Sequence, residues 1–249
     1  MIGRLVDDLC RAFPGRIFNA DITEVDYEGL LASGSTPADV SELICQYVSK
    51  LREMVRRHGM RLMVTQGPLD STGHLSGLGP KLDKLPKDIL IGSYYCAGGP
   101  YRPAWKTDFP RLRDKGFAFF AQVWIDSHNR LFPWIDHAAE FSDQEVRIGL
   151  AHGAAGSTTC DWGDEGHFHF TGQEWYPFLY HGASAWTGGQ VDRAYFDQAF
   201  TRILYGLPDD SVARAIRRIG GIEALKVKVR TASGQIVEQD FPFFWEFFA

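Results

Sequence analysis

Short apolar runs alternate with amphipathic segments along most of the chain. The runs at residues 61–65, 88–95 and 117–124 are nearly continuous in hydrophobicity, which is typical of parallel strands covered on both faces. Residues 16–20 and 156–160 are two further short segments with the composition of strands. The pattern therefore predicts five strands.

Segments with apolar residues at helical spacing separate these strands. They predict helices over residues 2–13, 37–58, 108–115, 134–152 and 175–186. Thr36 before Pro37 marks one helix start, because threonine caps a helix and proline is tolerated in its first turn. Beyond residue 186 the pattern predicts helices at 192–205 and 208–219, then a hairpin at 225–230 and 235–241.

The order of elements is β/α repeated about five times, which places the chain in the α/β class as an incomplete (β/α)8 TIM barrel. About three of the eight strands have no counterpart. Three explanations remain open. The chain is a portion of a larger barrel, or it closes the barrel with a second copy, as a homodimer, or with a partner chain, or its sheet is open and doubly wound. We expect a partial barrel at residues 1–206 and a helix-plus-hairpin extension at residues 207–249.

Composition narrows the classes of function. The chain has 249 residues, 45% of them hydrophobic, which is enough for a full core. A net charge of −5 provides no basic field for nucleic acid or anionic lipid, and no apolar run approaches the roughly 20 residues of a membrane helix. Residues 1–13 lack a signal-peptide core, and the four cysteines are widely spaced. We expect a cytoplasmic protein with reduced thiols and no nucleic-acid or membrane partner.

The densest chemistry lies in residues 154–186. The strand at 156–160 leads directly into Asp161, Trp162 and Asp164. Active sites of α/β barrels lie at the carboxyl ends of the strands, so this loop is a candidate site. Carboxylates beside an indole face suit a sugar, which offers hydroxyls at its rim and C–H groups on its faces. We therefore expect a carbohydrate substrate.

A metal site is the competing interpretation of this loop. Asp161, Asp164, His167 and His169 lie close together in the sequence. No further ligand follows at a recognisable spacing, and no glycine-rich phosphate loop occurs. We expect no metal and no cofactor.

Three motifs occur in order: FAQVWIDSHNRLFP, TTCDWGDEGH and EWYPFLYHGASAW. With them, the chain from the helix before Asp21 to about Gly206 resembles the second half of the catalytic barrel of glycoside hydrolase family 20, the β-N-acetylhexosaminidases, at about strands 4–8. The resemblance implies substrate-assisted retaining hydrolysis at terminal N-acetylhexosamine residues, an exception to the usual two-carboxylate scheme.

In that family, an Asp orients the acetamido group and the adjacent Glu protonates the leaving oxygen. The resemblance places Asp21 on the Asp, but the next residue is Ile22, which cannot transfer a proton. Glu24 is the nearest acid and the candidate substitute, unless it is a solvated loop residue. Where the family ends its fifth strand with a Trp and an acid, this chain has Thr65 and Gln66.

The resemblance also implies a sugar-binding wall at the strand ends. Its residues are Tyr94, Tyr95, Trp124, Asn129, Arg130, Trp162 and Asp164. The other tryptophans are expected to pack internally: Trp105, Trp134, Trp175, Trp186 and Trp245. Two alternatives remain open beside an active hydrolase, namely a catalytically silent sugar-binding relative and a truncated fragment of a larger glycosidase.

Overall fold

The computed structural model describes residues 2–22, 28–67, 69, 78–95, 105–125, 127, 130–162, 170–224, 226–230 and 234–240. The chain forms two compact units. The first unit comprises Met1–Tyr95, Gly99–Gln122 and Ile148–Thr158, and the second comprises Cys96–Gly98, Val123–Arg147 and Thr159–Ala249. The domain boundary at residue 206 stays a prediction.

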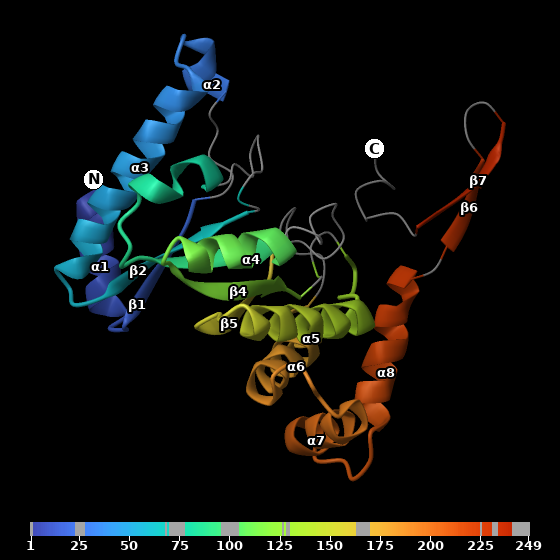
Figure 1. Ribbon diagram of the computed structural model, residues 1–249. Helices are drawn as coiled ribbons and strands as arrows, with labels where there is room; N and C mark the ends of the chain where they lie inside the picture. Colours follow the sequence, from blue (N-terminus) through green and yellow to red (C-terminus); the bar gives the residue numbers. More distant parts are fainter. Residues whose placement is uncertain are drawn as a thin grey trace. The chain divides into compact units, whose positions relative to one another are not determined.

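The main sheet has five parallel strands in the order β1-β2-β3-β4-β5 (Figure 1). They are β1 (Ile17–Asp21), β2 (Arg61–Gln66), β3 (Leu90–Tyr95), β4 (Ala118–Trp124) and β5 (Gly156–Cys160). A doubly wound sheet requires a point at which the strand order reverses, and this order has none. The sheet is therefore of the barrel type, as the sequence predicts, and the open doubly wound alternative is wrong.

The helices confirm the predicted β/α alternation. They are α1 (Ile2–Ala12), α2 (Glu28–Ala32), α3 (Pro37–Arg56), α4 (Trp105–Asp114), α5 (Ile135–Ala151), α6 (Trp175–Thr187), α7 (Arg193–Tyr205) and α8 (Ser211–Gly220). The 3-10 turns are η2 (Gly79–Lys84), η5 (Thr171–Gln173) and η6 (Gly221–Ala224), and β6 (Lys226–Arg230) and β7 (Ile236–Asp240) form the predicted antiparallel hairpin. Helix α2 and the 3-10 turns were not predicted. None of the described helices is long and apolar enough to cross a membrane.

The predicted start of α3 is confirmed by its hydrogen bonds. The Asp39 N–H donates to Thr36 Oγ1 at 3.2 Å, and the Thr36 N–H donates to the Asp39 carboxylate at 2.8 Å. This capping box satisfies two backbone donors that the first helical turn leaves without partners, and such a cap stabilises a helix by about 1 kcal/mol.

Helix packing within the first unit shows which face of β4 is covered. Phe119 stacks on Phe109 of α4 with ring centroids 5.0 Å apart. A Cβ on Gly149 would lie only 3.1 Å from the Ala121 Cβ, so that part of the chain packs closely on β4. Because side chains alternate along a strand, Gln122 projects to the opposite side. We call this opposite side the inner face.

The second unit has its own core among four helices. Its buried residues are Ile135, Ala139, Tyr176, Tyr180, Phe200 and Ala213. A polar network crosses the same helices. Asp197 of α7 accepts hydrogen bonds from the Tyr176 hydroxyl of α6 and from Arg217 of α8, while Arg217 also pairs with Asp136 of α5. Aromatic packing and charged contacts therefore join the same four helices.

The turn between α6 and α7 depends on Gly189. Its φ is +76°, and an added Cβ would lie 2.5 Å from the Asp143 carbonyl oxygen and 2.7 Å from Arg147 Cγ. We expect Gly189→Ala to lower the free energy of unfolding by about 3 kcal/mol, combining backbone strain with a clash that the backbone cannot relieve. Gly206→Ala is the matched control, because Gly206 has a φ of +71° and nothing within 4 Å of its Cβ position.

Urea denaturation of both variants separates the clash from the strain. Gly206→Ala should lose only about 1 kcal/mol, the cost of a left-handed alanine. Equal losses for the two variants would contradict the close packing of Gly189 on α5.

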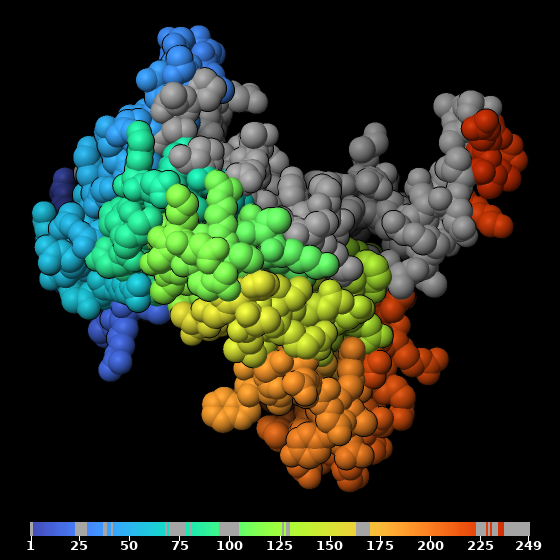
Figure 2. Space-filling view, in the orientation of Figure 1, coloured from blue at the N-terminus to red at the C-terminus, as the bar shows by residue number. Residues whose placement is uncertain are grey.

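The tryptophans only partly follow the sequence expectation. Trp105 is buried, as expected, whereas Trp175 is half exposed and Trp186 is 92% exposed. The expectation of internal packing is wrong for these two residues. On α6 the buried positions include Tyr176, Tyr180 and Ser184, so a residue two positions after Ser184 lies on the opposite side of the helix. Figure 2 shows α6, in orange, at the surface of the second unit.

Candidate functional site

Asp21, Thr65 and Gly92 are paired across three neighbouring strands of the first unit, at the carboxyl ends of β1 and β2 and in the middle of β3. Asp21 pairs with Thr65, and Thr65 pairs with Gly92. Paired residues of parallel strands lie on the same face of the sheet. Asp21 is exposed and is the last residue of β1. It therefore lies at the strand end where α/β barrels carry catalytic groups.

A polar cluster surrounds these paired residues. Thr65 Oγ1 lies 3.1 Å from Asn19 Oδ1 and 3.0 Å from Gln122 Oε1. Since a hydroxyl donates only one proton, one of these two amides must turn its NH2 group toward Thr65. A Cβ at Gly92 would lie 2.7 Å from Gln122 Oε1, so the glycine allows Gln122 of β4 to reach across β3 to β2. These contacts mark the inner face, and they place Asp21 on it.

Sequence reasoning missed this cluster, although a signal was present. Gln122 is the only polar residue in the run FAFFAQVW, and Gly92 interrupts the apolar run DILIGSYY. A glycine on the strand next to a polar side chain leaves room for that side chain to cross over and make a polar contact with the strand beyond. The order of strands β2, β3 and β4 was needed to connect Gln122 with Gly92 and Thr65.

Ile22 belongs to the core of the first unit. It is 4% exposed, and its N–H donates to the Thr65 carbonyl oxygen at 3.1 Å. A carboxylic acid at this position would have to be desolvated, which is costly without partners. The residue that follows Asp21 therefore has a packing role here.

The structure describes the side chain of only one of the two tyrosines that end β3. Tyr94 is 7% exposed, and alternation from Gly92 places it on the inner face, at the carboxyl end of the strand. Tyr95 is the last residue of β3, and its side chain lies outside the described residues. Tyr94 is thus the aromatic residue of this strand that the structure places on the same face as Asp21.

The second unit carries the two candidate tryptophans. Trp124 ends β4 and is 5% exposed, two residues after Gln122 and therefore on the same side of that strand. The Ile125 N–H donates to the Cys160 carbonyl oxygen at 3.1 Å, which holds the exits of β4 and β5 together. Trp162 follows β5 and is half buried.

Asp161 and Ser127 connect the loops that follow β4 and β5 in this unit. The Ser127 hydroxyl donates to the Asp161 carboxylate, and Ser127 is fully buried. The Thr159 hydroxyl donates to the Val123 carbonyl oxygen at 3.1 Å one step earlier along the strands. Ser127 was not a sequence candidate, and its contact fixes the carboxylate next to Trp162.

Arg130 is buried within the second unit, with 8% of its surface exposed. Its guanidinium lies over the indole of Trp134, 5.4 Å from the ring centroid, and the backbone N–H of Arg130 donates to the Ser127 carbonyl oxygen at 3.1 Å. A guanidinium held against an aromatic face gains cation–π attraction. Arg130 therefore packs against residues close to it in the sequence, on the segment that follows β4.

Three sequence candidates lie outside the described residues: Glu24, Asn129 and Asp164. The histidines of the metal interpretation, His167 and His169, also lie outside them. Among the residues that the structure describes, no group of three or more His, Cys, Asp or Glu side chains is arranged to hold a metal ion.

Comparison with known proteins gives likenesses to solved structures. No protein-family model matches the chain, and no curated protein is similar to it. A GH20 exo-β-N-acetylglucosaminidase from Vibrio harveyi is 14% identical over 87% of the chain, with a TM-score of 0.46. Two structures of the pneumococcal exo-β-D-N-acetylglucosaminidase StrH are 14% and 13% identical over 85% and 88% of the chain, with TM-scores of 0.44 and 0.46.

This chain covers 35%, 53% and 60% of those three solved chains. The first two of these structures are described as GH20 enzymes. The fold assignment itself rests on the strand order and on the β/α alternation of this chain.

Proposed function

We propose that the chain is a glycosidase catalytic portion that acts on terminal N-acetylhexosamine residues by substrate-assisted retaining hydrolysis. The observation that supports the proposal is Asp21, an exposed carboxylate at the end of β1 on the inner face. Tyr94 lies on the same face of the same unit and offers an aromatic side chain at the carboxyl end of β3, two strands from Asp21. The substrate class follows from the motif resemblance.

In the proposed reaction, the acetamido oxygen of the substrate attacks its own anomeric carbon as the glycosidic C–O bond breaks. Asp21 accepts a hydrogen bond from the acetamido N–H and stabilises the positive charge that develops on that group. Glu24 gives its proton to the leaving oxygen. Water then attacks the anomeric carbon, returns a proton to Glu24 and restores the acetamido group with retained configuration.

The first experiment measures the release of nitrophenol from aryl N-acetyl-β-glucosaminide and N-acetyl-β-galactosaminide by the purified chain. The matching aryl β-glucoside, which lacks the acetamido group, is the control substrate. Turnover of the acetamido sugars alone supports the proposal. Equal turnover of the plain glucoside would exclude substrate assistance, because that substrate has no internal nucleophile.

A second function, sugar binding without turnover, is favoured by Ile22. This residue occupies the position at which the family has its proton donor, and it is buried in the core. A chain without a proton donor can still orient a sugar, but it cannot protonate the leaving oxygen and so cannot cleave the glycosidic bond. Absence of nitrophenol release from the folded chain, together with binding of N-acetylglucosamine, would select this function.

Sugar binding is expected to change the fluorescence of Trp162, which is half buried beside Asp161. We expect Trp162→Phe to weaken binding of N-acetylglucosamine by about tenfold, because stacking of a ligand ring on an indole face contributes about 1 kcal/mol or more. Trp186→Phe is the control, because Trp186 is 92% exposed on α6. Equal effects of the two substitutions would contradict a sugar-binding role for Trp162.

A further inference from the structure

A pocket lies at the amino ends of β1 and β2 in the first unit. It has a volume of about 200 Å³, and its charged lining consists of Arg16, Arg52, Arg56, Arg61 and Asp88. Arg16 precedes β1 and Arg61 begins β2, while Arg52 and Arg56 lie in the last turns of α3. Four guanidinium groups around one small pocket are unusual in a chain with a net charge of −5.

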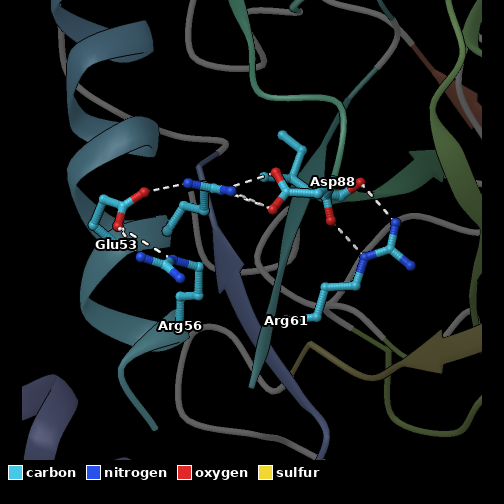
Figure 3. Close-up of polar contacts among 6 residues, drawn as sticks. Glu53, Arg56, Arg61 and Asp88 are labelled. Atoms are coloured by element: carbon cyan, nitrogen blue, oxygen red, sulfur yellow. Dashed lines mark hydrogen bonds and ion pairs between the residues drawn. The ribbon is translucent and has the colours of Figure 1, made fainter. Parts of the chain in front are cut away.

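Two of these arginines have carboxylate partners (Figure 3). Arg52 Nε lies 2.8 Å and 3.0 Å from the two carboxylate oxygens of Asp88, and Arg52 also contacts Glu53. Arg56 donates to Glu53 Oε2 at 3.2 and 3.3 Å. The hydrogen bond from Arg52 holds the pKa of Asp88 below its ordinary value, so Asp88 remains charged. These contacts connect α3 to the start of β3.

Among the described residues, the other two arginines are not hydrogen-bonded to a carboxylate, and the positive charge of Arg61 also lowers the pKa of Asp88. Arg61 donates to the carbonyl oxygens of Asp88 and Ile89, which are neutral acceptors (Figure 3). Among the residues that the structure describes, no ion pair involves Arg16 or Arg61. Four guanidinium groups therefore face two carboxylates, Asp88 and Glu53, and two positive charges remain.

Helix stability explains only part of this arrangement. Cations near the carboxyl end of a helix interact favourably with its dipole, which accounts for Arg52 and Arg56. Arg16 and Arg61 lie outside α3, at the starts of two neighbouring strands. The Arg61 N–H donates to the Arg16 carbonyl oxygen at 2.9 Å, so the backbone holds these two residues side by side.

We propose that this pocket binds a tetrahedral oxyanion, the phosphate or sulfate group of a small soluble molecule. Arginine is suited to this ligand because its planar fork donates two parallel hydrogen bonds to such oxygens. The pocket is smaller than the roughly 300–1,000 Å³ of pockets for drug-sized ligands, which fits a small anion. Arg16 and Asp21 lie at opposite ends of β1, about 16 Å apart along an extended strand, so the pocket is separate from the proposed sugar site.

The proposal is tested by calorimetric titration of the full chain with inorganic phosphate at low ionic strength, with sodium chloride as the salt control. We expect one saturable site with a Kd on the order of 1 mM that weakens as salt is added. Arg16→Gln and Arg61→Gln should each raise the Kd about tenfold. Arg113→Gln, an exposed arginine on α4 paired with Asp114, should leave it unchanged.

The two test variants complement each other. Arg61 contacts backbone carbonyls, so its replacement could alter folding. Among the described residues, the Arg16 side chain forms no hydrogen bond or ion pair. Parallel titrations with sulfate and with methyl phosphate distinguish a free anion from an esterified one, and tighter binding of either still supports the proposal. No saturation up to about 20 mM phosphate, or equal Kd values for Arg16→Gln and Arg113→Gln, would overturn it.

Discussion

Replacing Asp197 with alanine is expected to lower the free energy of unfolding by about 3 kcal/mol, because the buried Tyr176 hydroxyl and the partly buried Arg217 guanidinium would both lose an acceptor. Asp197 is 3% exposed and accepts hydrogen bonds from the Tyr176 hydroxyl and from Arg217 Nη1, the latter at 2.9 Å. Tyr176 is fully buried, and burial together with this bond raises its pKa, so it remains a donor. Alanine would leave that donor without its acceptor.

Urea denaturation measures this loss, with Asp210→Ala as the control. Asp210 pairs with Arg214 at 2.7 Å, but both side chains are well exposed, so its replacement should cost about 0–1 kcal/mol. A double-mutant cycle between Tyr176→Phe and Asp197→Ala isolates their interaction. A loss below about 1 kcal/mol for Asp197→Ala would show that the four helices do not depend on this network.

The alternation of strands and helices could be predicted because each element is specified by its own residues. The run from Phe117 to Trp124 is apolar enough to be a buried strand, and Thr36 with Pro37 starts a helix through local hydrogen bonds. Helix α2 could not be predicted in this way, because its five residues lie within an acidic loop and are too few to show a period. The sequence pattern therefore predicted those elements that are specified by residues within the element itself.

The exposure of Trp186 shows where composition misleads. Tryptophan is usually buried to a large extent, and α6 is apolar on average, so internal packing was expected. Which side of α6 is buried depends on α7, whose Phe196 packs edge-on against Tyr176 with ring centroids 5.2 Å apart. The sequence of α6 alone contains no information about that partner.

The candidate site was predictable only as single residues at strand ends. Asp21 and Tyr94 were selected through the family resemblance, and both lie at the carboxyl ends of parallel strands, where α/β barrels carry their sites. The contact of Gln122 with Thr65 depends on Gly92, which lies on the strand between them. This contact spans three strands, so it becomes visible only when strand order and register are known.

Replacing Asp21 with asparagine is expected to lower kcat for aryl N-acetyl-β-glucosaminide by about 10²–10³-fold, the loss typical for one group that stabilises transition-state charge. Asparagine keeps the shape of the side chain but cannot balance the positive charge on the acetamido group. Because Asp21 is exposed at the end of β1, the substitution should leave the free energy of unfolding almost unchanged. Asp114→Asn, an exposed acid on α4, is the control and should retain full activity.

The leaving group separates the proposed roles of Asp21 and Glu24. Nitrophenol departs without much help from an acid, whereas a sugar alcohol needs a proton as the bond breaks. Glu24→Gln should therefore slow hydrolysis of a disaccharide far more than that of the aryl glycoside, while Asp21→Asn should slow both alike. If the chain binds sugar without turnover, Asp21→Asn should still weaken N-acetylglucosamine binding about tenfold, because a charge-assisted hydrogen bond is lost. If Asp21→Asn changed neither turnover nor sugar binding, Asp21 would have no role in the proposed site.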